Sequence, residues 1–511
     1  MDEKMKTDVL IIGAGGAGLT AALAAKNAGV NVRVITKEYP TRSQTCMAQG
    51  GMNAALGNIS PDSIEEHIQN TLKSAHGQAN EEAVRYMCSE APNAVAWLDE
   101  IGVCFSRTPE GKIAQRRLGG ASAPRACYAQ DYTGLKILHT LYERCLQKDI
   151  EMLNERYLVD LLCKKDGSVC GALILNIRSG EIEHLFAKSV ILATGGYSRV
   201  YDKYSTNSTA STGDGIATAK RAGVKLLGME FVQFHPTGLK NSSILISESA
   251  RGEGGYLLNS KGERFTNELA PRDEVSRAIH EQILAGEEVF LDIRHLGEQF
   301  IDENLPQERK LALLYENVDP VKDLIPIKAV AHYTMGGIEV DNKSQTSVSG
   351  LFACGECANH KVHGANRLGG NSLLEIIVFG REAGKSAANF NLCDDKCQND
   401  FDFKKETNFL ESLKEYKNEI DFYEKRTFVG ELFYKKVGII RKESELLNAQ
   451  EELQLLQNQL PQMGVKDGSK VYNTNLVEFI EFRNMLDVCE VVVASALARK
   501  ESCGAHFVAE E

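Results

Sequence analysis

The first forty residues show a sharp change in hydrophobic pattern. A short run in which every residue is apolar, 9–12, leads into six glycine-rich residues, 13–18, and an alanine-rich stretch then ends at Gly29. A second expected strand, 30–37, which is rich in valine, follows directly. Wholly apolar runs of this length are typical of strands buried on both faces, and glycine commonly ends a helix. The pattern therefore predicts a right-handed βαβ unit.

The pattern along the rest of the chain predicts further units. Residues 189–196 and 350–356 are apolar runs that end in small residues, as sheet strands do where they approach a ligand. Between them, 235–329 has turn motifs and little strict periodicity, which indicates an inserted domain. Lys, Glu, Leu and Gln dominate residues 403–462, and the first proline within that range is Pro461. That composition predicts helices, with 392–402 as the linker before them.

Composition and charge narrow the class of protein. The 511 residues are 43% hydrophobic and 25% charged, which is typical of a globular protein with two or three domains. A net charge of −12 opposes the binding of nucleic acid. The 13 cysteines are odd in number and scattered, which favours a reducing compartment. The most membrane-like stretch, 9–25, contains four glycines and is short for a bilayer span, so we expect neither a signal peptide nor a transmembrane helix.

The glycine-rich turn carries the first candidate chemistry. Gly13, Gly15 and Gly18 form a GxGxxG pattern between the expected strand and helix. This arrangement places backbone N–H groups and a helix N-terminus against a pyrophosphate, and predicts a dinucleotide site. The acidic residue that usually meets the ribose is absent, because the second strand ends at Thr36 and Lys37 follows it. The turn alone therefore does not choose between FAD and NADP.

Seven blocks further along supply that choice. They lie at 41–58, 211–215, 229–239, 247–255, 269–279, 331–341 and 363–381. Together they resemble the flavoprotein subunit of succinate dehydrogenase and fumarate reductase, from about residue 7 to residue 506. The resemblance implies an α/β fold: a Rossmann-like FAD-binding domain (1–234 and 330–391), an inserted α+β capping domain (235–329) and a C-terminal helical domain (403–511). It also implies FAD as the cofactor.

The chemistry that this resemblance implies needs cations for two carboxylates, a hydride carrier, and a proton donor on the opposite face of the alkene. The family's dicarboxylate clamp falls on His235, Ser247, His332 and Arg367. Arg367 suits a carboxylate because a guanidinium offers two parallel N–H bonds. Without the resemblance, the same residues would be interpreted as a helix-capping serine and as internally paired histidines and an arginine.

The proton donor of the family falls on Arg272. A guanidinium holds its proton strongly, so donation requires immediate resupply. Glu248 and Arg251, three residues apart, match the family's relay to solvent. Without the resemblance, Glu248 and Arg251 would be interpreted as a plain ion pair.

The resemblance also assigns contacts to FAD. These are expected at the glycines 13, 15 and 18 and at Lys37, Ser43, Thr45, Asp214, Glu356 and Ser372. One position departs from the respiratory members, which have a histidine bonded covalently to the flavin where this chain has Gln44. An amide is not a comparable nucleophile, so we expect noncovalent FAD. The missing bond should make the flavin harder to reduce, which biases the chain toward fumarate reduction.

Three other features qualify the resemblance. Leu118 stands where these dehydrogenases usually have a phenylalanine, and Cys503 stands where they usually have an arginine. Cys354 and Cys357 form a CxxC, which we interpret as part of a cofactor-contacting loop rather than as a redox pair. Cys393 and Cys397 are spaced like half of a zinc site, but no second pair accompanies them, so we expect no protein-bound metal.

The leading hypothesis is a fumarate reductase or succinate dehydrogenase flavoprotein subunit that acts mainly on fumarate. The resemblance implies an iron–sulfur subunit as electron partner and a membrane or quinone-linked subunit. It implies a cytoplasmic location, with attachment to the inner face of the cytoplasmic membrane only through those partners. L-Aspartate oxidase is the alternative enzyme: Gln44 suits it, whereas Leu118 cannot meet the amino group of aspartate. A third hypothesis is a flavin-binding electron-transfer subunit with a vestigial site.

Overall fold

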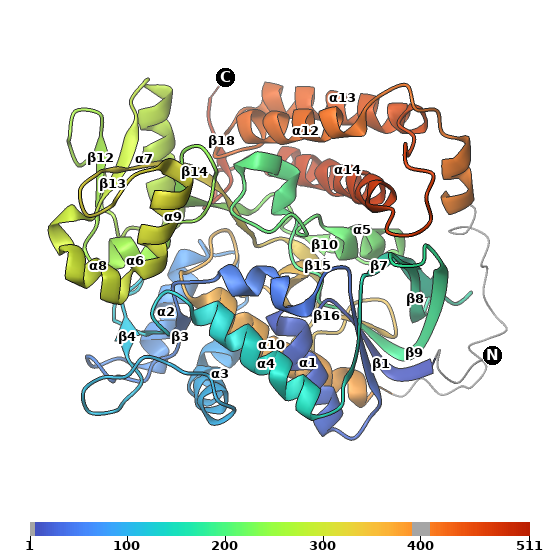
Figure 1. Cartoon of the computed structure of the whole chain (residues 1–511), viewed down its shortest axis with the longest axis horizontal. Helices are drawn as coiled ribbons and strands as arrows, with labels where there is room; N and C mark the ends of the chain where they lie inside the picture. The colour runs from blue at the N-terminus through green and yellow to red at the C-terminus, as the bar shows by residue number, and fades with distance from the viewer. Residues whose placement is uncertain (1–5, 391–408, 511) are drawn as a thin grey trace.

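The computed structural model describes residues 6–390 and 409–510 (Figure 1). Its central sheet contains the predicted βαβ unit: β1 (Lys6–Ile12), α1 (Gly16–Asn27) and β2 (Val32–Thr36), with β1 and β2 parallel. The sheet order is β6-β2-β1-β9-β8-β7, and β16 pairs with β9. The other strands are β6 (Glu151–Asn154), β7 (Arg156–Cys163), β8 (Val169–Asn176), β9 (Ile182–Leu192) and β16 (Leu351–Ala353). The two apolar runs predicted after the first unit are therefore strands of one sheet.

A pair of helices covers one side of β1. Helix α1 packs along α10 (Asn371–Ala388), and glycines set how closely the two approach. A Cβ at Gly384 would lie 2.2 Å from the carbonyl oxygen of Ala21, and one at Gly380 would lie 2.9 Å from that of Ala17. Larger residues at either position would push the helices apart, which would move the glycine-rich turn at the start of α1.

The segment between β9 and β16 forms a second sheet. Its antiparallel order is β11-β14-β13-β12, from β11 (Val232–Leu239), β12 (Tyr256–Asn259), β13 (Val289–Asp292) and β14 (Ile325–Thr334). Helices α6 (Glu248–Gly252), α7 (Arg272–Leu284), α8 (Glu298–Asn304) and α9 (Pro306–Glu316) accompany it. Figure 1 shows this part, in yellow-green, to one side of the central sheet. The division into domains stays a prediction, and its expected limits, 235 and 329, fall inside β11 and β14.

Helices dominate the last part of the chain. They are α12 (Phe422–Lys436), α13 (Glu443–Gln459) and α14 (Thr474–Ala498), drawn in orange and red in Figure 1. Two of these helices, α12 and α13, lie in the range 403–462 for which helices were predicted, and β18 (Ile440–Arg441) between them pairs with β19 (Phe507–Val508). The expected linker, 392–402, and the pair Cys393 and Cys397 lie outside the described residues. In the ranges that are described, no helix combines the length and apolar character needed to cross a membrane.

The remaining elements complete the FAD-binding part predicted from the sequence. They are α2 (Ile64–Ser74), α3 (Glu81–Glu100), α4 (Thr133–Gln147), α5 (Asp214–Arg221), β3 (Met52–Asn53), β4 (Gln115–Arg116), β5 (Ala126–Cys127), β10 (Leu226–Leu227), β15 (Gly337–Glu339) and β17 (Ala358–Asn359). Several loops between these elements, together with the start of α6, α7 and α10, face one cavity.

Candidate active site

The cavity is the meeting point of the predicted site residues. It measures about 1610 Å³ including its open mouth, against the roughly 300–1,000 Å³ that is common for one drug-sized ligand. Every predicted site residue except Gly18 and Arg251 lines it. Its size suits a long cofactor and a small substrate placed end to end.

The glycine turn forms one end of the cavity. Gly13 has φ +112°, and a Cβ there would lie 2.2 Å from the carbonyl oxygen of Ala193. Gly18 does not line the cavity, but a Cβ there would lie 2.0 Å from the carbonyl oxygen of Gly13, so this glycine lets α1 sit tightly on the turn. At Gly15 the nearest atoms to an added Cβ, including those of Ser43, are 3.7 Å away. The turn therefore keeps the backbone open to a ligand at the start of α1.

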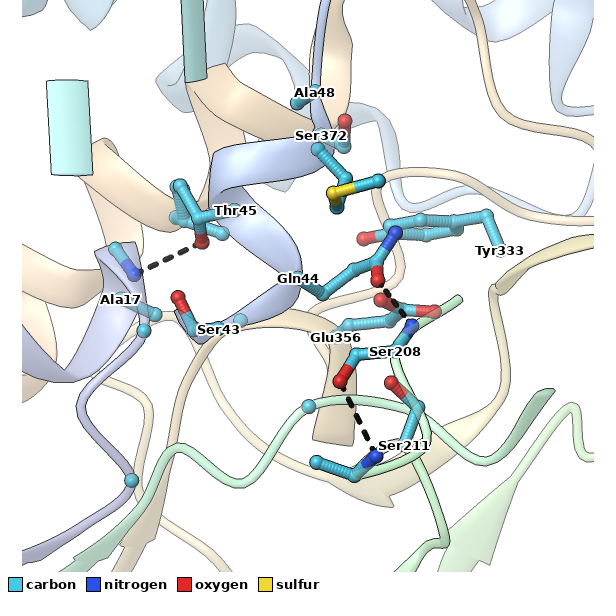
Figure 2. A pocket seen from close by; sticks show the side chains of 18 of the residues that line it. Ala17, Ser43, Gln44, Thr45, Ala48, Ser208, Ser211, Tyr333, Glu356 and Ser372 are labelled. Carbon is cyan, nitrogen blue, oxygen red and sulfur yellow. Dashed lines mark hydrogen bonds between the residues drawn. The ribbon is translucent and has the colours of Figure 1, made fainter. Parts of the chain in front are cut away.

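Three further observations test whether a pyrophosphate fits this end. The N-cap residue of α1, Gly15, has no side chain to cap the helix, so the N–H groups of the first turn depend on partners from outside the helix. The hydroxyl of Ser43 is buried and has no hydrogen-bond partner among the described residues. The hydroxyl oxygen of Thr45 accepts a hydrogen bond from the N–H of Gly16, at 3.0 Å (Figure 2). Free donors at a helix N-terminus are what a pyrophosphate requires, and the residues present fit FAD.

Lys37 lies at the end of β2 but is already occupied by protein groups. Its ammonium donates to Thr212 at 2.9 Å and to the carboxylates of Asp214 and Glu481 at 2.7 Å each. Burial alone would lower the pKa of Lys37, but the two carboxylates raise it above its usual value. Asp214 also accepts hydrogen bonds from Tyr157 and Asn484. Lys37 and Asp214 thus form a charge-balanced wall of the cavity, held from α14 by Glu481, which the sequence analysis missed.

Gln44 lies in the middle of the cavity with Glu356 and Tyr333 (Figure 2). Its carboxamide oxygen accepts the N–H of Ser208 at 2.6 Å, so the side chain is anchored to the backbone. Glu356 accepts the N–H of Thr334 at 2.9 Å, and burial raises the pKa of this carboxyl to about 7.

The two cysteines of the CxxC pattern lie close to Glu356 in the sequence, and Cys354 lines the cavity. Cys354 and Cys357 are free thiols, and both are fully buried. The thiol of Cys357 points to the backbone carbonyls of Leu192 and Cys354, at 3.3 and 3.4 Å. Burial raises the pKa of Cys357 to about 11, which leaves little thiolate at neutral pH. This geometry does not favour thiol redox chemistry.

Two histidines from neighbouring strands lie at the opposite end. His235 on β11 and His332 on β14 have ring centroids 4.8 Å apart. Burial, followed by the charge of Arg272, lowers the pKa of both rings well below its usual value, so both are neutral. Nδ1 of His235 accepts the N–H of Thr237 at 3.2 Å, which leaves the proton of the neutral ring on Nε2. The ring is therefore a donor at its outer nitrogen.

Arg367 supplies an unpaired positive charge at this end. Its guanidinium is 3% exposed and lies over the ring of Tyr333, 4.4 Å from the centroid. It donates to the hydroxyl of Ser372 and to a backbone carbonyl, both at 3.4 Å, and its Nε has no partner. In the part of the chain that the structure describes, no carboxylate forms an ion pair with it. A buried guanidinium without a counterion is costly, so the site is built to receive an anion.

Arg272, Glu248 and Arg251, the predicted proton donor and relay residues, lie in contact in a row. Nε of Arg272 donates to Glu248 at 3.0 Å, and Nη2 of Arg251 lies 3.7 Å from the same carboxylate. Burial would raise the pKa of Glu248, but the two guanidinium groups lower it, so the carboxylate is ionised. Arg251 is completely buried behind Glu248, and burial lowers its pKa to about 10. The carboxylate of Glu248 thus contacts both guanidinium groups. This arrangement suits a plain ion pair as well as the relay that the family resemblance implied.

Ser247 was interpreted either as a substrate-binding residue or as a helix cap, and its position suits both. It lines the cavity, and its hydroxyl caps α6 by accepting the N–H of Ser249 at 3.2 Å. Its own N–H donates to Glu308, also at 3.2 Å. The serine is held from both sides at the first turn of the short helix that carries Glu248.

Sequence reasoning missed several supporting residues. The side-chain oxygen of Gln233 accepts from Arg272 at 3.1 Å, and the N–H of Gly119 donates to Glu248 at 2.9 Å. Gln233 could have been found, because it lies two residues before His235 on β11 and therefore faces the same side. Leu118 lines the cavity as an apolar wall. The described residues contain no cluster of three His, Cys, Asp or Glu side chains arranged for a metal.

Comparison with known proteins agrees with this geometry. The family model described as FAD binding domain matches residues 8–373, and the model described as fumarate reductase flavoprotein C-term matches 426–510. The succinate dehydrogenase flavoprotein subunit of Rickettsia felis is 39% identical over 98% of this chain and 89% of its own. The 8-methylmenaquinol:fumarate reductase flavoprotein subunit of Wolinella succinogenes is 40% identical over 98% and 85%.

Solved structures give the same result. A quinol-fumarate reductase determined with menaquinol molecules superposes with a TM-score of 0.94 at 38% identity, covering 99% of this chain and 93% of its own. Adenylylsulfate reductase from Archaeoglobus fulgidus shares the fold alone, at 18% identity and a TM-score of 0.79. The near-complete coverage and the shared identity show that this chain belongs to the family of succinate dehydrogenase and fumarate reductase flavoprotein subunits.

Proposed function

We propose that this chain is the catalytic flavoprotein subunit of an enzyme that interconverts fumarate and succinate, with fumarate reduction as the favoured direction. The observation that carries the proposal is the buried, unpaired guanidinium of Arg367 in the same cavity as Arg272, His235 and His332. A small dianion would neutralise this excess of positive charge, and neutral histidine donors would fix its orientation.

In this mechanism the chain's own residues bind and orient the substrate. Arg367 holds one carboxylate, and Nε2 of His235 donates to the dianion together with His332. Ser247 places its hydroxyl at the edge of the same space. FAD, when bound along the cavity at the glycine turn and near Ser43, Thr45, Glu356 and Ser372, supplies the hydride.

Arg272 donates the proton. A proton leaves a guanidinium nitrogen of Arg272 for the alkene carbon that does not receive the hydride. Glu248, bonded to Nε of Arg272, passes a replacement proton that it receives from Arg251. The close contacts in this row and its burial support immediate resupply, which a strongly basic donor requires.

The proposed direction rests on Gln44. Its amide holds the N–H of Ser208 and offers no nucleophile for a covalent flavin bond. Noncovalent FAD should have a lower potential than covalently bound FAD, which favours electron flow to fumarate. L-Aspartate oxidase is the weaker proposal, since Leu118 gives the cavity an apolar wall and no carboxylate for an amino group.

We also propose that the electrons come from an iron–sulfur subunit, because the chain has no run of cysteines spaced for clusters. The quinol-linked names of two relatives support a further membrane or quinone-linked subunit. Attachment to the inner face of the cytoplasmic membrane would then occur through these partners.

The test is an anaerobic assay of the full chain loaded with FAD, with reduced viologen as electron donor. The proposal expects fumarate to oxidise the dye and to yield one succinate for every two dye molecules. In a separate assay in air, without the dye, aspartate should yield no hydrogen peroxide. Peroxide formed from aspartate, with no succinate formed from fumarate, would favour L-aspartate oxidase. Dye oxidation without succinate would indicate an electron-transfer subunit.

A further inference from the structure

Behind the substrate end of the cavity lies a buried acid that the mechanism above does not use. Glu308, the third residue of α9, has no exposed surface. Its Oε1 accepts the N–H of Ser247 at 3.2 Å, and its Oε2 is buried with no hydrogen-bond partner among the described residues. Ser247 lines the cavity, so the carboxyl of Glu308 is separated from it only by the wall that this serine forms.

A second buried carboxyl lies beside it. Asp131 precedes α4 and accepts the N–H of Gln307 at 2.7 Å, so it binds the first turn of α9. Its other oxygen, Oδ1, is buried and unpartnered, like Oε2 of Glu308. Two neighbouring buried carboxylates repel each other, and one shared proton removes that repulsion.

The charged groups around Glu308 do not neutralise it. The positive charge of Arg116 acts on Glu308, but its guanidinium donates to the backbone carbonyls of Gly50 and Gln130 and lies 3.9 Å from Glu253. On α6, Glu248 pairs with both Arg251 and Arg272. On α9 itself, the guanidinium of Arg309 bonds three other carboxylates. Tyr132 also faces the pair, as a neutral phenol.

These contacts decide the protonation state. Burial, with the charge of Asp131 added, raises the pKa of Glu308 to about 8. A proton on Oε2 turns an unpartnered acceptor into a donor, while Oε1 remains the acceptor for Ser247. The neutral acid is therefore the form that satisfies the buried atoms best.

We propose that Glu308 is a positioning residue that acts as a neutral acid: it fixes Ser247 and the first turn of α6, and it must stay uncharged for a dianion to bind in front of it. This inference rests on the proposed function, because it concerns binding of the dicarboxylate. When Glu308 ionises, a negative charge appears directly behind the clamp and repels the substrate. Binding of the dianion weakens, whereas the reaction of bound substrate changes much less.

The experiment measures kcat and KM for fumarate between pH 6 and 9.5, with the FAD-loaded full chain and reduced viologen. For the wild type we expect kcat/KM to fall about tenfold from pH 7 to pH 9, mainly through KM, because the neutral fraction of Glu308 falls from about nine-tenths to about one-tenth over that range. Glu308→Gln keeps an acceptor for Ser247 and cannot ionise, so its kcat/KM should fall less than twofold. Glu308→Leu loses the acceptor and should be slower at every pH, and the glutamine variant should restore most of that loss.

Glu253→Gln is the matched control. Burial also raises the pKa of Glu253, which faces Arg116 but does not touch Ser247, so its profile should follow the wild type. An equal alkaline fall in Glu308→Gln and wild type would overturn the inference while leaving the proposed function intact. So would a Glu308→Leu variant with wild-type kinetics, or a fall that disappears in Glu253→Gln instead. If the wild type does not reduce fumarate at any pH, the proposed function fails and this inference with it.

Discussion

Glu308 should make the fold less stable as the pH rises, and the size of this effect follows from its environment. The pKa of the carboxyl is about 8 in the folded chain, against 4.5 for an ordinary glutamate. Below about pH 4.5 the group is protonated in both the folded and the unfolded chain and costs nothing. Between pH 4.5 and 8 the unfolded chain ionises while the folded chain stays neutral, so stability is lost throughout that window.

Each pKa unit is worth about 1.36 kcal/mol, so at pH 7 the buried acid costs roughly 3 kcal/mol of unfolding free energy. Glu308→Gln removes the ionisation and keeps the acceptor for Ser247. We therefore expect the stability of this variant relative to wild type to increase by roughly 2–3 kcal/mol from pH 5.5 to pH 7.5.

Urea unfolding of the FAD-loaded chain at several pH values measures this difference. Glu308→Leu provides the control, because it also lacks the ionisable group but loses the bond to Ser247. The two variants should therefore run parallel with pH, with the leucine variant offset to lower stability. Wild type and Glu308→Gln curves that run parallel between pH 5.5 and 7.5 would refute the assignment of a neutral buried acid.

Three further predictions concern the cofactor end of the cavity. Acid precipitation should release all of the FAD because Gln44 forms no covalent bond, and flavin retained on the precipitated protein would contradict this. Gly18→Ala places a Cβ 2.0 Å from backbone and should abolish FAD retention on gel filtration, whereas Gly468→Ala, with nothing within 4 Å, should retain it. Glu481→Gln removes one of two anions from the partly buried Lys37 and should cost roughly 1–3 kcal/mol in unfolding free energy and weaken FAD binding in fluorescence titrations; unchanged values for both would show that the contact is dispensable.

The sequence was most informative where structure is set locally. The βαβ unit follows from two apolar runs and a glycine turn, since pattern and turn chemistry act over neighbouring residues. The clamp and the proton row came from motifs, and the structure brings Arg367, Arg272 and Glu248 to one cavity although the two arginines lie far apart in the chain. The roles of these residues are proposals, whereas their presence in one cavity is a feature of the structure.

Contacts between distant segments were beyond sequence reasoning. Lys37 and Glu481 are 444 residues apart, and nothing near either one marks the other as its partner. The same holds for Asp131 and the start of α9, which are 176 residues apart. Glu308 looks like one more surface glutamate in a charged stretch, because the sequence does not show which face of that helix is buried. Only tertiary packing turns these side chains into parts of the site.

The central claim is that Arg272 delivers the proton to a dicarboxylate held by the clamp, and a single-turnover experiment tests it most directly. Flavin in the full chain is reduced anaerobically, fumarate is added, and flavin reoxidation is followed by absorbance in wild type, Arg272→Ala and Arg107→Ala. Arg107 lies at the surface with Asp99 and serves as the control. The account predicts rapid reoxidation in wild type and Arg107→Ala, and reduced flavin that persists in Arg272→Ala. Reoxidation by fumarate at the wild-type rate in Arg272→Ala would contradict it.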